Sequence, residues 1–211
     1  IPTGIRPLDE MTIGGAGSGE LWLIAAYAGV GKTFFCTNLA YNFAVMERKN
    51  VVYLTAETIR SQVRRRVLTR HARHPKFGLP NGLSSGDLKK HTPNNPILTP
   101  QQISQWQTVM EDLTTNEDKG IFHLSQIPMG AKISTIHAKL NKLNSVFPID
   151  AVIIDSLDLL SPESKRSSNR EELNDILADA KLLATSFDNG RGIRLISPWQ
   201  TSRDAWKEAK A

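Results

Sequence analysis

Short apolar runs alternate along the chain with longer amphipathic stretches. Five runs have the length and composition of buried strands: 21–26, 51–55, 121–124, 151–154 and 193–196. The fourth is the strongest, because Val152, Ile153 and Ile154 are all β-branched. Alternation of strands with helices over most of a chain predicts an α/β fold, with a mostly parallel sheet flanked by helices.

The stretches between these strands have helical periodicity and predict helices at 32–46, 60–73, 100–113, 133–143 and 171–187. In the second of them, Ile59, Val63 and Val67 form a narrow apolar stripe. Residues 75–100 are rich in Pro, Gly, Asn and Ser and predict an irregular connection. We therefore expect one domain, 1–211, with a variable insertion at 75–117.

The length of 211 residues fits one large domain, at about 150 residues per domain. No apolar run approaches the roughly 18 residues of a membrane span, and no secretory leader is visible, although the chain begins at Ile1. The single cysteine, Cys36, permits no internal disulfide. These features predict a reducing compartment, with no secretion and no membrane partner.

The net charge of +5 comes from one segment. Residues 58–86 contain seven Lys or Arg and no Asp or Glu, whereas the remainder carries 19 basic and 21 acidic residues. Such a block suggests phosphate-rich partners, but a solvated helix face has the same composition.

The segment 26–33, Ala-Tyr-Ala-Gly-Val-Gly-Lys-Thr, follows a strand and opens a helix. It matches the phosphate-loop motif G-x-x-x-x-G-K-[ST], except that Ala26 replaces the first glycine. Glycines let successive N–H groups point at a phosphate, and the helix N-terminus attracts the anion. A lysine after them supplies charge to the β- and γ-phosphates, and the threonine hydroxyl can ligate Mg²⁺. Nucleotide binding is therefore expected at Ala28, Gly29, Val30, Gly31, Lys32 and Thr33.

Three further polar residues end or follow predicted strands. Asp155 ends Ala-Val-Ile-Ile-Asp and fits the carboxylate that supports Mg²⁺ in the Walker B position. Glu57 follows Val-Val-Tyr-Leu-Thr and is our candidate for the base that activates water, although a glutamate in a first helical turn is also a common structural residue. Gln200 follows the last strand and is a candidate sensor of the γ-phosphate.

These motifs resemble the RecA-like motor domain of DnaB-type replicative helicases. The resemblance rests on the opening Ile-Pro-Thr-Gly-Ile-Arg-Pro-Leu-Asp-Glu, on the phosphate loop with its Ala26, on Val-Val-Tyr-Leu-Thr-Ala-Glu and on Ile-Ile-Asp-Ser-Leu-Asp-Leu-Leu. It covers nearly the whole chain and is weakest over 75–113. It implies a RecA-like P-loop fold, ATP and Mg²⁺ as ligands, catalytic roles for Lys32, Glu57 and Gln200, and a phosphate-sensing role for Arg203.

The same resemblance implies a hexameric ring of identical subunits that translocates on single-stranded DNA. It places the reducing compartment in a bacterial or phage-like cytoplasm or in an organelle such as the mitochondrion. Members of the family carry a trans-acting arginine finger beyond the glutamine motif, whereas this sequence stops at Ala211, so we expect a motor domain truncated at its C-terminal end. Much of the charge on helix 60–73 is then expected to lie on an outer face or at a contact between subunits. DNA contacts are expected from basic loops at Lys165, Arg166, Arg170 and Lys207, which could equally be mobile solvated surface.

The expected function is ATP hydrolysis coupled to strand separation. A recombinase-like or clock-protein-like ATPase, which switches assembly without unwinding, would have nearly the same fold and site. A nucleotide-binding module that only docks a partner is a second alternative, and the intact Glu57 argues against it.

Overall fold

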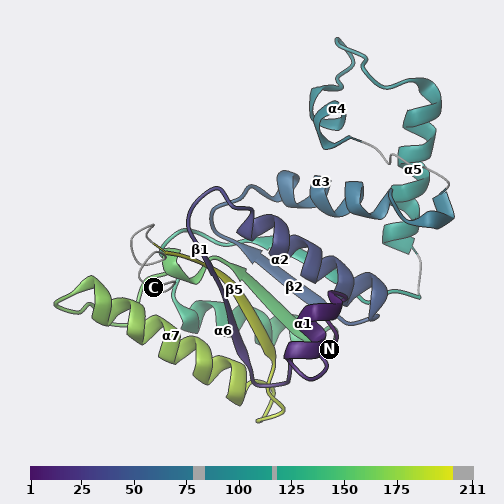
Figure 1. Ribbon diagram of the computed structural model, residues 1–211. Coiled ribbons are helices and arrows are strands. Elements are labelled where there is room, and N and C mark those ends of the chain that lie inside the picture. The colour runs from purple at the N-terminus through teal and green to yellow at the C-terminus, as the bar shows by residue number, and fades with distance from the viewer. Residues whose placement is uncertain (78–83, 116–117, 202–211) are drawn as a thin grey trace.

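A computed structural model describes residues 1–77, 84–115 and 118–201 of the chain. The apolar runs form a five-stranded sheet of β1 (Leu21–Ala26), β2 (Val51–Thr55), β3 (Phe122–Gln126), β4 (Ala151–Asp155) and β5 (Arg194–Gln200). The strand order is β1-β5-β4-β2-β3, and every pairing among them is parallel (Figure 1). The predicted α/β class with a parallel sheet is confirmed.

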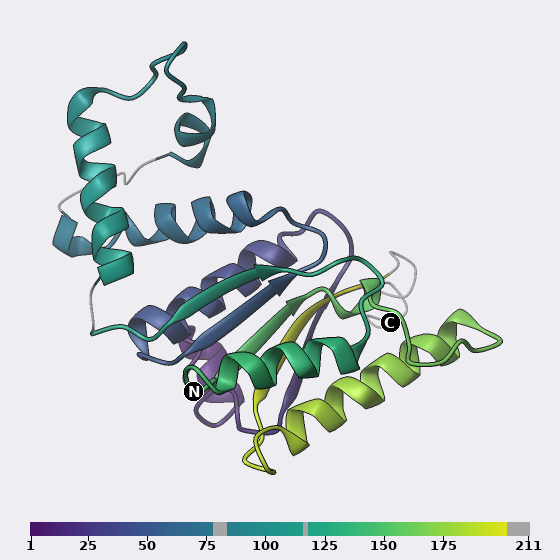
Figure 2. The same ribbon diagram turned by 180° about the vertical axis from the view of Figure 1, so that it is seen from behind.

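Helices cover both faces of the sheet. One face carries α2 (Lys32–Tyr41) and α3 (Arg60–His71), and the other carries α6 (Ile133–Asn144) and α7 (Asn169–Ser186) (Figures 1 and 2). Successive strand residues point to opposite faces, so β2 and β4 supply side chains to both cores and are buried throughout. This double covering explains why these strands read as unbroken apolar runs.

Several helix predictions need correction. The helix expected at 32–46 ends as α-helix at Tyr41 and continues as one π-helical turn, Asn42–Met46. A short helix, α1 (Arg6–Met11), was not predicted, because six residues carry too little periodicity. Another, α4 (Ser85–Lys90), lies in the connection predicted as irregular, and its N-cap Ser84 accepts from the backbone N–H groups of Gly86 and Asp87.

The segment that contains α4 and α5 (Pro100–Thr115) projects away from the sheet (Figure 1). It is joined to the body through His71 on α3, whose ring is fully buried. His71 Nδ1 lies 2.9 Å from the hydroxyl of Tyr41, and Nε2 lies 2.7 Å from Oδ2 of Asp112 on α5. Lys76 and Lys119 also pair with this carboxylate, at 2.5 and 2.7 Å. Whether 75–117 is a variable insertion stays a prediction.

Within the described ranges, no helix is long and apolar enough to cross a membrane. Cys36 is fully buried in the core between the sheet and α2, as its apolar surroundings predicted. Its burial raises the pKa of the thiol far above the usual range, so Cys36 behaves as a small apolar residue.

Candidate nucleotide site

The polar residues predicted from the sequence meet at one edge of the sheet, where the parallel strands end. Ala26 at the end of β1 pairs with Gln200 at the end of β5, and Thr55 at the end of β2 pairs with Asp155 at the end of β4. β5 lies between β1 and β4. The carboxyl edge of a parallel sheet is where ligands bind in open α/β folds.

The phosphate loop curls back between β1 and α2. Gly29 and Gly31 have φ angles of 84° and 95°, in the left-handed region that glycine adopts without strain. A Cβ on Gly29 would meet nothing within 4 Å, so the backbone conformation and not lack of space selects glycine there. Residues 28–31 are exposed at the start of α2, which leaves their N–H groups open to an anion.

Thr33 and Asp155 face each other across the site. The Thr33 hydroxyl donates to Oδ1 of Asp155 at 3.4 Å, a long contact. Oδ2 of Asp155 accepts a shorter hydrogen bond of 2.8 Å from the hydroxyl of Tyr53 on β2. Burial raises the pKa of Asp155, and the hydrogen bonds from Tyr53 and Thr33 oppose this rise.

Glu57 lies two residues beyond β2, on the exposed side of the same edge. The turn that carries it is fixed, because Oγ1 of Thr55 donates to the carbonyl oxygen of Thr58 at 2.6 Å. The negative charge of Glu57 contributes to the raised pKa of Asp155, and the charge of Arg66 on α3 acts in the opposite direction. Glu57 therefore belongs to the same electrostatic neighbourhood as Asp155.

Gln200 is the last residue of β5 and not part of the loop after it, where the sequence had placed it. Its N–H donates to Oδ2 of Asp158 at 3.2 Å, and the next N–H, of Thr201, donates to the carbonyl oxygen of Ala26 at 3.1 Å. The end of β5 is thus hydrogen-bonded to both the phosphate loop and the segment after β4. Asp158, which makes this connection, was not singled out from the sequence.

The basic residues proposed for DNA lie in the segment that follows β4, in the loop before α7 and in its first turn. Lys165, Arg166 and Arg170 are all exposed. Arg166 already has a partner, because its Nε lies 2.5 Å from Oδ2 of Asp175. The other two proposed residues, Arg203 and Lys207, lie outside the described residues.

A family model described as the DnaB-like helicase C-terminal domain matches residues 1–207. The chain belongs to this family. The resemblance inferred from its motifs is therefore confirmed.

Curated members of the DnaB-like family that resemble the chain include the replicative DNA helicase DnaB of Geobacillus stearothermophilus, 28% identical over 189 residues. That match covers 89% of this chain and 37% of the relative. The replicative DNA helicase DnaC of Bacillus subtilis (strain 168) is 27% identical over 185 residues, which is 87% of this chain and 36% of the relative. The chain thus spans little more than a third of the length of these helicases.

Solved structures show the same fold. A DnaB-like replicative helicase, solved in a study of its interactions with primase, gives a TM-score of 0.76 at 20% identity, over 98% of this chain and 46% of that one. A second solved structure, of an ATPase domain, superposes with a TM-score of 0.78 at 20% identity, over 98% of this chain and 66% of that one. The RecA-like fold expected for a DnaB-like domain is confirmed.

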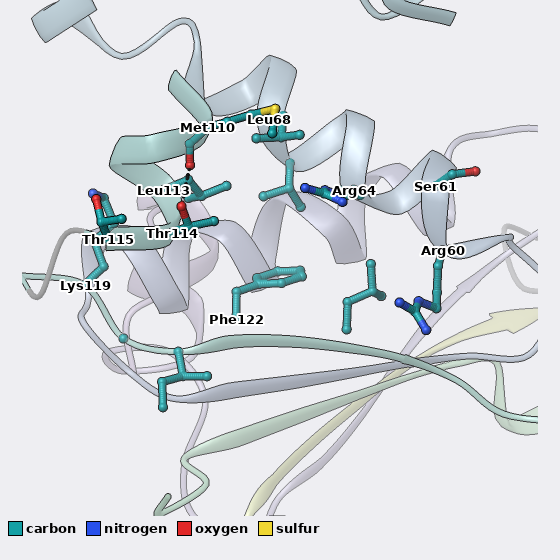
Figure 3. A pocket seen from close by; sticks show the side chains of 14 residues that line it. Arg60, Ser61, Arg64, Leu68, Met110, Leu113, Thr114, Thr115, Lys119 and Phe122 are labelled. Atoms are coloured by element: carbon teal, nitrogen blue, oxygen red, sulfur yellow. Dashed lines mark hydrogen bonds between the residues drawn. The ribbon is translucent and has the colours of Figure 1, made fainter. Parts of the chain in front are cut away.

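This DnaB-like domain also has a groove away from the nucleotide site, at the β3 edge of the sheet. The groove has a volume of about 770 Å³ and lies between α3, α5 and β3 (Figure 3). Phe122 and Leu113 line it, and Arg60 and Arg64 of α3 reach it from one end (Figure 3). Part of the charge on α3 therefore borders an apolar groove and does not face open solvent alone.

Proposed function

We propose that this chain is the ATP-hydrolysing motor of a DNA helicase, which translocates on single-stranded DNA and separates strands. The observation that carries the proposal is that four polar residues meet at one edge of the sheet. Asp155 and Gln200 end their strands, and Thr33 and Glu57 lie in the segments that follow β1 and β2. Membership of the DnaB-like family supports it.

The phosphates of ATP would lie against the N–H groups of the phosphate loop and the N-terminus of α2. Lys32 Nζ now donates to the carbonyl oxygens of Ala26 and Tyr27, at 2.9 and 3.1 Å. We expect it to exchange these partners for phosphate oxygens when ATP binds. The loop itself can keep its fold, because its glycines already hold the required backbone conformation.

The residues present fit Mg²⁺. The hydroxyl of Thr33 and the carboxylate of Asp155 are hard oxygen ligands that face each other, and Mg²⁺ in such sites uses one or two carboxylates together with phosphates and water. When bound, the ion offsets the charge that develops on the phosphate oxygens. No group of three or more His, Cys, Asp or Glu gathers within the described ranges, and this ligand set does not need one.

The remaining catalytic work falls to Glu57 and Gln200. Glu57 accepts the proton of the water that attacks the γ-phosphate. The amide of Gln200 donates toward the γ-phosphate, and the hydrogen bonds at the end of β5 would pass a change there to Ala26 and Asp158.

DNA binding is assigned to Lys165, Arg166 and Arg170, which would contact phosphates without reading sequence. Arg203 and Lys207 keep their proposed roles as a phosphate sensor and a DNA contact. Assembly into a hexameric ring of identical subunits would let a neighbour supply a cation to each site, and such a cation is worth about 10³ to 10⁵ in turnover.

The test is ATP hydrolysis measured with and without single-stranded DNA over a range of protein concentrations. We expect turnover per subunit to rise with concentration as rings form, and to rise again with DNA. Brisk hydrolysis by the monomer, independent of concentration, would contradict a site shared between subunits. Failure to hydrolyse ATP even in a single turnover would instead favour a nucleotide-binding module.

A further inference from the structure

Asp155 is held by a hydroxyl from the neighbouring strand. Tyr53 lies on β2, where it pairs with Ile153 of β4. Asp155 is two residues after Ile153, so its side chain leaves the sheet on the same face as that of Tyr53. The Tyr53 hydroxyl donates to Oδ2 of Asp155 at 2.8 Å, while Oδ1 faces Thr33.

Both partners of this hydrogen bond are enclosed. Tyr53 is fully buried, and Asp155 is only 1% exposed. The ring of Tyr53 is fixed by the apolar core below α2 and by a stacked contact with Phe122 at 6.3 Å between centroids. Phenylalanine would fill the same space without the cost of burying a hydroxyl, so packing alone does not explain a tyrosine here.

The bond also determines which oxygen of Asp155 is available. A carboxylate has two oxygens that rotate together, and a charge-assisted hydrogen bond to one of them fixes the direction of the other. With Oδ2 held by Tyr53, Oδ1 lies on the side of Thr33 and the first turn of α2.

We propose that Tyr53 is a positioning residue for the Mg²⁺ site, whose hydroxyl holds Oδ2 of Asp155 so that Oδ1 is presented beside Thr33. This inference rests on the proposed function, in which Thr33 and Asp155 support the ion. It does not involve the nucleotide directly, because Lys32 and the loop N–H groups bind the phosphates. Loss of the hydroxyl should therefore weaken the contribution of Mg²⁺ and spare metal-free binding.

The experiment is the Tyr53→Phe substitution, which removes one oxygen and keeps the shape of the ring. Affinity for a fluorescent ATP analogue is measured in EDTA and then across a Mg²⁺ titration, with hydrolysis blocked in both proteins by Glu57→Gln. We expect unchanged affinity in EDTA and a Mg²⁺ concentration for half-maximal effect that rises about tenfold, as is typical when a residue that orients a metal ligand is removed.

Tyr41→Phe is the matched control. It also removes the hydroxyl of a buried tyrosine, the last residue of α2, but that hydroxyl binds His71, not Asp155. We expect it to leave the Mg²⁺ titration unchanged, and thermal unfolding of both variants confirms that they are folded.

Two results would overturn the inference alone: a Mg²⁺ titration of Tyr53→Phe equal to that of the parent, or an equal loss of affinity in EDTA and in Mg²⁺. A parent protein whose nucleotide affinity does not respond to Mg²⁺ would overturn the proposed function as well.

Discussion

The ammonium group of Lys32 lies 2.9 Å from the carbonyl oxygen of Ala26, at the point where β1 passes into the phosphate loop. The lysine is thus folded back onto its own loop and is not part of either apolar core. Its contacts are hydrogen bonds between a charged donor and backbone acceptors that can be exchanged for stronger ones with phosphate oxygens.

Lys32→Ala should therefore reduce nucleotide affinity by about tenfold or more and leave the fold intact, because a hydrogen bond to a charged group contributes roughly 1.5–3 kcal/mol. Equilibrium binding of ATP, with thermal unfolding in the absence of nucleotide, measures both effects. The matched control is Lys142→Ala, which removes an exposed lysine from α6 on the opposite face of the sheet. Parental ATP affinity in Lys32→Ala would refute the assignment of the phosphate loop.

Glu57→Gln should keep ATP affinity and lose hydrolysis, since an amide has nearly the same shape but cannot accept the proton. Removal of a positioned base typically lowers the rate by about 10² to 10⁴. Single-turnover hydrolysis with bound ATP isolates this step from release of product. Full turnover by the variant, in rings that assemble normally, would move the role of base to another residue.

The buried His71 should make stability depend on pH. Burial lowers the pKa of His71 below its ordinary value of 6.5, against the opposing effect of Asp112. Between the lowered pKa of the folded protein and the ordinary value of 6.5, the unfolded chain binds more protons than the folded protein. The free energy of unfolding therefore falls as pH is lowered through that window, by at most about 1.4 kcal/mol per pH unit. Tyr41, Asp112, Lys76 and Lys119 surround the ring.

His71→Gln should remove this part of the slope, because glutamine does not titrate. Chemical denaturation of the two proteins at a series of pH values below 6.5 gives the difference directly, and His123, whose pKa is also lowered, contributes equally to both. An identical slope in both proteins would show that His71 titrates alike in the folded and unfolded states.

How much of this domain can be predicted from the sequence depends on whether a feature is a local pattern or a contact that only the fold creates. The phosphate loop, Asp155 and the apolar strands are local patterns, and the structure forms β1 and β4 where the sequence predicts them, although β1 is only partly buried. The Tyr53 hydroxyl was missed because its residue stands in an apolar strand, where a tyrosine reads as a core aromatic. Only the parallel register of β2 and β4 brings it to Asp155.

Charge was the least informative signal, because the fold and not the local sequence decides which partners each basic residue meets. Arg64 and Arg66 look alike in the sequence, yet Arg64 is exposed at a groove and Arg66 acts on the electrostatics of Asp155. The salt bridge between Arg166 and Asp175 joins residues nine positions apart across the turn into α7. A count of basic residues does not show which cations are already neutralised.

Lys165→Ala combined with Arg166→Ala should weaken single-strand binding about equally for all sequences. The salt dependence of log affinity should flatten by about 0.7 per lost phosphate contact. Because Arg166 is paired with Asp175, we expect Lys165 to account for more of the loss. ATP affinity should not change. An unaltered slope, with affinity lost instead in Arg60→Ala combined with Arg64→Ala, would place the DNA at the groove of Figure 3.

The most direct test of the central claim is unwinding of a forked DNA duplex by the assembled protein, measured as the release of a labelled strand. The account predicts strand release with ATP and Mg²⁺ and none with Glu57→Gln at equal DNA and ATP occupancy. DNA-stimulated ATP hydrolysis and a change of assembly state without any strand release would contradict it, and would identify an ATPase that switches assembly.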